Sequence, residues 1–164
     1  MRALRYLYLL ALVIWLGGMV IAGLIVAPTT FGVLEAWDAA KGRVLAGQVF
    51  GGVLGRFYLV AYAAGVLMLL ILTIQRVLGP RPKSYGIRVG LVGLMLGTML
   101  YGGMVLAPQI DQLQAEVAGP MNLLPETDHR RVAFDRAHQL STALFSVAML
   151  GGLILLGWES REHA

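Results

Sequence analysis

The sequence predicts an all-α integral membrane protein, a four-helix bundle formed by two tandem two-helix repeats. Composition supports the membrane setting, because hydrophobic residues make up 58% of the 164 residues and charged residues 13%, against about 45 to 50% and about 25% in soluble domains. A second observation supports the repeat: residues 23–28 (GLIVAP) align with residues 103–108 (GMVLAP) at an offset of 80.

The same offset aligns other positions of the two halves without a gap. Among them are Leu16 with Leu96, Met19 with Met99, Arg56 with Arg136, and Ala63 with Ala143. A register that holds through both hairpins indicates duplication of a two-helix unit. We therefore predict a single transmembrane domain, 1–164, with repeat one at about 1–80 and repeat two at about 81–164.

Four stretches are long enough to be transmembrane helices, at 6–28, 57–74, 87–107 and 138–158. A hydrocarbon core of roughly 30 Å needs about 20 apolar residues, and a lone span must be helical to satisfy its own backbone. The first stretch follows two arginines as a signal peptide does, but its apolar run is too long and lacks a clear cleavage site. It is expected to remain in the mature protein.

The basic residues predict which side of the membrane each loop faces. The N-terminal segment and the loop at 76–88 hold six basic residues without an acidic neighbour, and Arg161 adds one near the C-terminus. The other two loops mix six basic residues with acidic ones. By the positive-inside rule, both termini are expected to be cytoplasmic, in a multi-pass protein of the inner (cytoplasmic) membrane. The pI near 9.8 then reflects topology, and no nucleic-acid partner is required.

The connections between the spans are expected to differ in length. The loop at 76–88 is predicted to be a tight linker with Gly79, Pro80 and Pro82, whereas the loops at 29–55 and 109–136 are longer. Apolar residues at 44–54 recur at helical spacing, which predicts an interfacial helix or an extension of the second span. Pro28 and Pro108 are expected to end or kink their helices. Before the fourth span, Thr127 or Asp128 is a candidate helix cap.

Polar residues near the spans define a candidate cofactor site at the outer boundary. His138 is the first candidate ligand, because Asp135 lies one helical turn before it and can orient an imidazole that binds a metal or haem iron. The opposing interpretation is an interfacial anchor. By the repeat, Tyr58 is the counterpart of His138. The predicted cofactor-binding set is His138, Asp135, Tyr58, Arg56 and Arg136.

Methionines provide a second candidate site, for copper. Met19 and Met99 are repeat equivalents, and Met104 lies nearby. Thioethers are soft ligands that suit Cu(I), although methionine also fills gaps in ordinary cores. His138, Met19, Met99 and Met104 are thus the predicted metal ligands, and haem or copper is the candidate cofactor. Glycines on the first and third spans predict close helix packing, or room for a flat cofactor.

Several short motifs resemble a known family of small four-helix membrane proteins. They are the WLGGM run at 15–19, the exit of the first span at 26–31, residues 50–57, the Ala107-Pro108 end of the third span, and Phe134 to His138 with Ser141. Together they resemble bacterial proteins of unknown function related to eukaryotic transmembrane protein 205. This family is distantly similar to copper-resistance D-type domains and to bacterial haem-binding protoporphyrinogen oxidase. The resemblance implies metal or haem chemistry at membrane histidines, and for the eukaryotic relatives a link to platinum-drug resistance.

Three functional hypotheses follow. The first is a non-enzymatic membrane protein that handles or transports a metal ion or small solute. The second is a haem-binding redox protein using His138, and the third is a structural or assembly subunit with a membrane-protein partner or a second copy. The sequence has no serine triad, phosphate loop, HExxH or paired-carboxylate motif. An enzyme is therefore the less favoured class, and the lipid bilayer is the one partner that all three hypotheses share.

Overall fold

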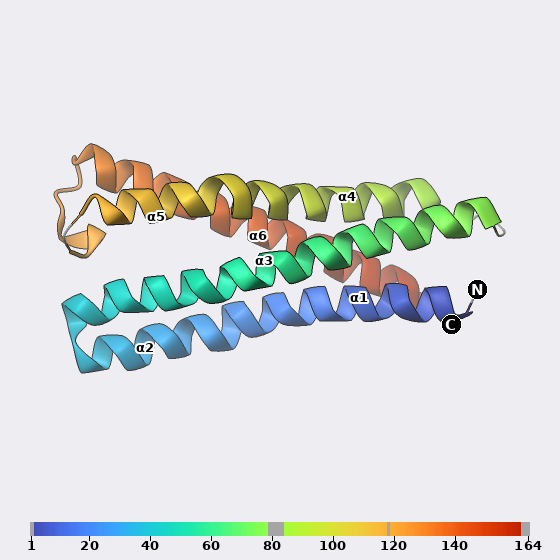
Figure 1. Ribbon diagram of the computed structural model, residues 1–164, viewed down its shortest axis with the longest axis horizontal. Coiled ribbons are helices and arrows are strands. Elements are labelled where there is room, and N and C mark those ends of the chain that lie inside the picture. Colours follow the sequence, from blue (N-terminus) through green and yellow to red (C-terminus); the bar gives the residue numbers. More distant parts are fainter. Residues whose placement is uncertain (1, 79–83, 118, 162–164) are drawn as a thin grey trace.

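The computed structural model describes residues 2–78, 84–117 and 119–161, which form four long helical rods lying side by side (Figure 1). The first rod consists of α1 (Arg2–Ile21), the π-helix η1 (Ala22–Val26) and α2 (Ala27–Trp37), and the second is α3 (Ala39–Leu78). The third consists of α4 (Tyr85–Tyr101), the π-helix η2 (Gly102–Leu106) and α5 (Ala107–Ala115); a 3-10 turn, η3 (Met121–Leu123), precedes the fourth, α6 (His129–Arg161). The predicted linker residues Gly79, Pro80 and Pro82 lie outside the described residues.

The rods confirm the predicted four-helix membrane bundle. Each contains a candidate membrane span of 31 to 38 residues, in which an 18-residue window has a mean hydropathy of 1.8 to 2.7, and is long and apolar enough to cross a membrane. No strand occurs in the described residues. Because α1 begins and α6 ends at the same end of the bundle (Figure 1), both hairpins open in the same direction. We call this end the terminal end and the opposite one the hairpin end.

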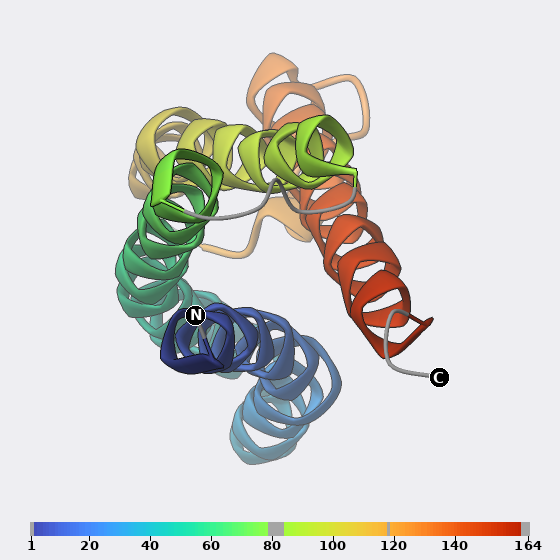
Figure 2. The ribbon, with the colours of Figure 1, turned by 90° about the vertical axis from the view of Figure 1, so that its right-hand side faces the viewer.

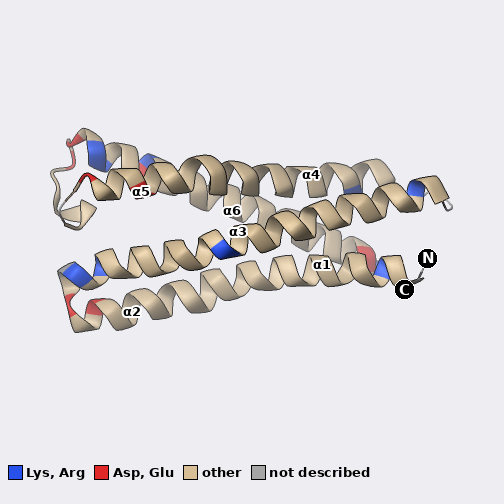
Figure 3. Cartoon of the chain, in the orientation of Figure 1, with Lys and Arg blue, Asp and Glu red and all other residues tan. Residues whose placement is uncertain are grey.

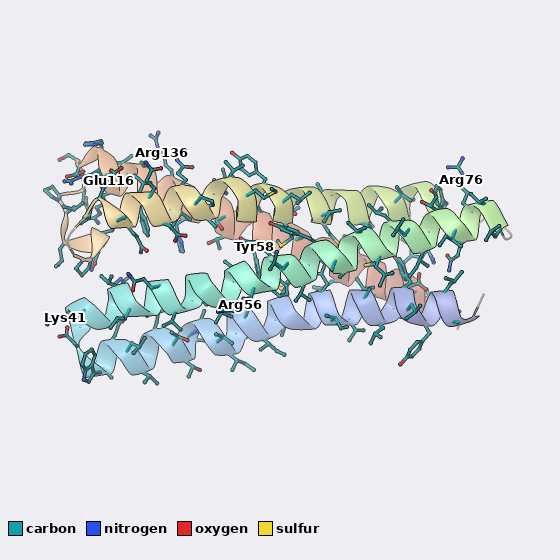
Figure 4. The ribbon with its side chains drawn as sticks, viewed as in Figure 1. Lys41, Arg56, Tyr58, Arg76, Glu116 and Arg136 are labelled. Atoms are coloured by element: carbon teal, nitrogen blue, oxygen red, sulfur yellow. The ribbon has the colours of Figure 1, made fainter. Side chains whose placement is uncertain are left out.

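Charged residues mark where the bilayer fits along the rods. They gather at the two ends (Figure 3), and Arg56 lies in the middle of α3 (Figure 4). On α3, no charged residue lies between Arg56 and Arg76, a distance of roughly 30 Å at 1.5 Å per residue. That distance equals one hydrocarbon core.

The regions at 29–55 and 109–136 are mostly helical, which corrects their prediction as long loops. α2 and the first part of α3 form an extended helical hairpin, so the apolar spacing at 44–54 belongs to an extension of the second span. Asp128 caps α6, since its carboxylate accepts the amide of Arg130 at 2.9 Å. This confirms one of the two predicted caps.

Each proline was predicted to end or kink its helix, and the helix end is wrong, because helical structure continues past Pro28 and Pro108 to Trp37 and Ala115. A proline ring clashes with the carbonyl four residues earlier in a regular α-helix. Here a wider π-helical turn precedes each proline. The amide of Ala27 donates a hydrogen bond to the carbonyl of Ala22, and the amide of Ala107 donates one to the carbonyl of Gly102. Each acceptor lies five residues earlier in the chain. The wider turn accommodates the proline ring and lets the helix continue.

The core lies where α1, α3, α4 and α6 meet, in the order that Figure 2 shows around the bundle. Trp15 and Met19 of α1 are fully buried there, as are Met68 of α3 and Met95 of α4. Glycines allow these close approaches. The Trp15 ring lies against Gly65, and the side chain of Met95 lies against Gly151. The predicted role of small residues in packing thus applies to particular glycines, since Gly17, Gly23, Gly93 and Gly97 have open space beside them.

The tip of the first hairpin depends on a glycine. A Cβ on Gly42 would meet the backbone carbonyl of Leu34 and lie 2.9 Å from the backbone amide nitrogen of Glu35. Backbone atoms cannot move aside cheaply, so Gly42→Ala is expected to lower the free energy of unfolding by about 1 to 3 kcal/mol. Thermal unfolding in detergent, followed by circular dichroism, measures the change.

Gly32→Ala is the matched control for this prediction, because a Cβ at Gly32 meets nothing within 4 Å. Alanine favours helix over glycine by about 1 kcal/mol. The control is therefore expected to leave stability unchanged or to raise it slightly. Equal stability of the Gly42→Ala and Gly32→Ala variants would show that the close approach does not matter.

Candidate functional site

The main candidate site is a lateral groove between α3 and the η2–α5 segment, with a volume of about 390 Å³. Its lining residues are Gly51, Gly55, Tyr58, Leu59 and Tyr62 of α3, with Gly103, Met104, Ala107, Pro108 and Asp111 of the third rod. On both sides these residues are spaced three, four or one apart, so each set forms one helical stripe. We call this feature the α3–α5 groove.

Helix geometry gives the groove a direction. The lining extends over residues 51–62 of α3 and 103–111 of the third rod, or roughly 12 to 16 Å at 1.5 Å per residue. Because α3 and α5 run in opposite directions, Tyr62 and Gly103 lie at its inner end, whereas Gly51 and Asp111 lie toward the hairpin end. Leu59 and Met104 are 67% and 68% exposed. The groove therefore opens sideways, toward the lipid.

Two tyrosines build the inner part of the groove. Tyr58, in the middle of α3 (Figure 4), is buried, and its ring stacks with that of Tyr62 at 6.1 Å between centroids. The Tyr62 hydroxyl donates to the backbone carbonyl of Met99 at 3.2 Å. Gly103 makes this arrangement possible, because a Cβ there would overlap the Tyr62 hydroxyl and lie 2.8 Å from the Tyr58 ring.

Asp111 is the charged residue of the lining. It is exposed at the outer end of the groove. Among the described residues, its carboxylate forms no salt bridge or hydrogen bond. Arg56 does not line the groove, and its guanidinium donates to the carbonyl of Gly52 at 3.2 Å. The groove therefore combines an apolar, partly aromatic wall with one negative charge.

The residues predicted to bind a cofactor lie in two separate places. Tyr58 of α3 lines the α3–α5 groove, whereas His138, Asp135 and Arg136 lie on α6 and are exposed. The His138 ring stacks on Phe134 at 6.0 Å, and Asp135 pairs with Arg131 at 3.8 Å instead of with His138. Arg136 lies near the start of α6 (Figure 4). The structure thus assigns Asp135 an arginine partner on its own helix.

The methionines predicted to bind metal are also divided. Met19 and Met99 are buried in the core cluster with Met68 and Met95, whereas Met104 is exposed beside the groove. Residues 2–78, 84–117 and 119–161 contain no group of three or more histidine, aspartate or glutamate side chains arranged to hold a metal ion.

A buried ionic cluster at the terminal end was missed by the sequence analysis. Arg88 of α4 and Glu159 of α6 pair at 2.7 Å, with side chains only 8% and 5% exposed, and Arg5 of α1 reaches the same carboxylate at 3.7 Å. This corrects the description of Arg88 as a loop arginine without an acidic neighbour. Glu159 follows an apolar run directly and is 71 residues away in the sequence, so no local signal indicates the pair.

At the hairpin end, a partly buried ionic group stabilises the start of α6. The Arg130 side chain donates to Asp128 at 3.2 and 2.8 Å. These bonds lower the pKa of the Asp128 carboxyl to about 2, and the carboxylate in turn raises the pKa of Arg130. The group fixes the beginning of the helix and lies outside the α3–α5 groove.

The fold and the lateral groove together define the class of this protein, a multi-pass membrane protein whose four apolar helices imply a lipid bilayer around them. Residues 10–118 match the family model described as domain of unknown function (DUF4149), and the chain belongs to this family. No curated protein and no solved structure matched the chain in two further comparisons.

Proposed function

We propose that the protein is a non-enzymatic membrane protein that binds a small amphiphilic solute from the lipid in the α3–α5 groove. The observation that carries the proposal is the groove itself. Its volume of about 390 Å³ falls within the range of small-molecule sites, which are mostly apolar with few polar groups. Gly51 and Gly55 keep one wall open, since a Cβ added to either would have no atom within 4 Å.

The position of the groove also supports an amphiphile. Arg56 and Asp111 lie at the predicted outer boundary of the hydrocarbon, so the groove runs from the apolar layer to the interface. An amphiphile entering from the lipid would place its apolar part beside Leu59 and Met104 and its polar part near Asp111. In the proposed orientation, the protein lies in the inner membrane with both termini in the cytoplasm. The groove then lies in the outer leaflet.

The tandem repeat forms part of the proposal. The two π-helical turns, at 22–26 and 102–106, differ by 80 residues, which is the offset found in the sequence, and Ala-Pro follows each. Equal irregularities at equal positions support descent of both hairpins from one unit. The relation to transmembrane protein 205 and to copper-resistance D-type domains rests on the sequence motifs alone.

A second candidate function is copper handling in the core. It is favoured by the four buried methionines, Met19, Met68, Met95 and Met99, which come from three helices. Haem binding at His138 remains a prediction, as does a role as a structural or assembly subunit of a membrane complex. Metal analysis and an absorption spectrum of the purified protein separate the candidates: bound copper supports the thioether site, and a Soret band supports haem.

Filling the groove is expected to abolish solute binding. Gly55→Leu introduces a side chain into open space, so the variant should fold normally while its leucine overlaps the bound solute. Overlap that costs more than 1.4 kcal/mol lowers affinity by about tenfold or more. Calorimetry in zwitterionic nanodiscs, with subtraction of empty discs, measures the loss of affinity. para-Octylbenzyl alcohol and para-octylbenzylamine are tested separately.

Gly32→Leu is the matched control, since it adds the same side chain at an equally open glycine that does not line the groove. It is expected to bind both compounds as the original protein does. If Gly55→Leu retains the binding of both, the groove is not the site and the proposed function fails.

A further inference from the structure

We infer that the α3–α5 groove selects amphiphiles that carry one positive charge, such as alkylaryl amines, and that Asp111 recognises this charge. The inference rests on the proposed function and specifies its ligand class. It follows from which polar groups of the lining remain available to a ligand, from the charge at the outer end, and from the shape of the site.

Few neutral polar groups remain available in the lining. Tyr58 and Tyr62 supply the two hydroxyls. Tyr62 donates its hydrogen bond to the Met99 carbonyl, and Tyr58 is buried, with Ser141 of α6 near its hydroxyl. The remaining lining residues, apart from Asp111, are glycine, alanine, proline, leucine and methionine. A ligand in the inner part of the groove therefore meets aromatic rings and aliphatic surface.

The outer end of the groove offers a negative charge that no described residue neutralises. Asp111 lines the groove and has no ion-pair partner in the described part of the chain. Charge pairs strengthen near a low-dielectric surface, so a cation beside Asp111 is stabilised and an anion is repelled. The nearest basic residue along α3, Arg56, is bonded to Gly52 and does not line the groove.

The shape of the groove fits an amphiphile with its charge at one end. Only one end carries a charge, and the stacked tyrosines line the inner part of the groove. An aromatic ring with a single aminomethyl group can place the ring near Tyr58 and the ammonium near Asp111. The alkyl tail can leave through the open side between Leu59 and Met104 into the lipid.

Matched compounds test the inference. para-Octylbenzylamine is positively charged at neutral pH, and para-octylbenzyl alcohol has nearly the same shape without the charge. The amine is expected to bind roughly three to ten times more tightly than the alcohol, in the range of partly screened ion pairs. Added salt should weaken amine binding and leave alcohol binding unchanged. Calorimetry in zwitterionic nanodiscs with subtraction of empty discs gives both affinities.

Asp111→Asn should remove the preference, lowering amine affinity roughly three- to tenfold without affecting the alcohol. Glu116→Gln is the matched control, because Glu116 is an exposed carboxylate at the end of the same helix (Figure 4) and lies outside the groove. It makes the same change in net charge and should leave both affinities as they are.

The outcomes separate this inference from the proposed function. Equal affinities of the original protein for amine and alcohol, or an Asp111→Asn variant that retains the preference, would overturn the charge selection. The groove would then remain the site, provided that Gly55→Leu still abolishes alcohol binding. If neither compound binds the original protein, both the inference and the proposed function fail.

Discussion

Glu159→Gln is expected to lower the free energy of unfolding by about 3 to 5 kcal/mol, the usual cost of removing one partner from a buried ion pair. The Glu159 carboxylate accepts Arg88 at 2.7 Å and lies near Arg5 at 3.7 Å, so the substitution leaves the Arg88 charge buried without its carboxylate. Arg88 of α4 and Glu159 of α6 belong to the second hairpin, and the contact of Arg5 of α1 with Glu159 joins the two hairpins at the terminal end. Unfolding in detergent, followed by circular dichroism, measures the loss.

The control for Glu159→Gln is Glu35→Gln. Glu35 pairs with Arg43 at 3.2 Å, but both side chains are substantially exposed, at 36% and 52%. Exposed pairs contribute about 0 to 1 kcal/mol, so this variant should unfold almost as the original protein does. A Glu159→Gln variant that is no less stable than Glu35→Gln would contradict the importance of the buried cluster. Replacing Arg88 and Glu159 together by leucine should recover part of the stability, because no charge is then left buried alone.

Trp15→Ala is expected to lower the free energy of unfolding by about 3 to 5 kcal/mol, since it leaves a large cavity in the core. The Trp15 side chain is fully buried, and a Cβ added to Gly65 would lie 3.0 Å from its ring. Few other side chains can fill this space. The same unfolding measurement in detergent, with circular dichroism as the signal, gives the change.

Trp15→Phe separates ring packing from hydrogen bonding at this position. The indole Nε1 atom of Trp15 is buried and has no hydrogen-bond partner among the described residues. Phenylalanine retains an aromatic ring and removes this unsatisfied donor, so the loss should be less than half that of Trp15→Ala. Equal losses in the two variants would contradict the expectation that an aromatic ring at this position fills most of the space.

Much of the fold could be predicted from the sequence because the bilayer restricts the choice of structure. Apolar stretches of about 20 residues must form helices in lipid, and four of them were recognised. The prolines were interpreted correctly as matched positions that end or kink their helices, but of these two expectations the helix end was wrong. The wider turn at 102–106 forms because the Ala107 amide donates its hydrogen bond to the carbonyl of Gly102. Single-residue rules about proline do not specify which carbonyl accepts this bond.

The candidate site was predicted in part. Tyr58, one of the polar residues expected at the outer boundary, lines the α3–α5 groove. The groove was not predicted, because it depends on how far α3 lies from α5 and on which residues of the two helices meet. The roles of His138, Asp135, Arg56 and Arg136 in ligand binding remain predictions that the proposed binding and metal measurements can test.

The sequence by itself determined the membrane class, the helical content and the number of spans, since these follow from the length and composition of local segments. Only the tertiary structure decided which polar residues meet. Arg88 and Glu159 lie far apart in the chain, and Tyr58 meets Gly103 across two helices. Contacts of this kind depend on the rotation and depth of each helix against its neighbours. Many rotations bury similar apolar area, so the hydrophobic pattern alone does not select one of them.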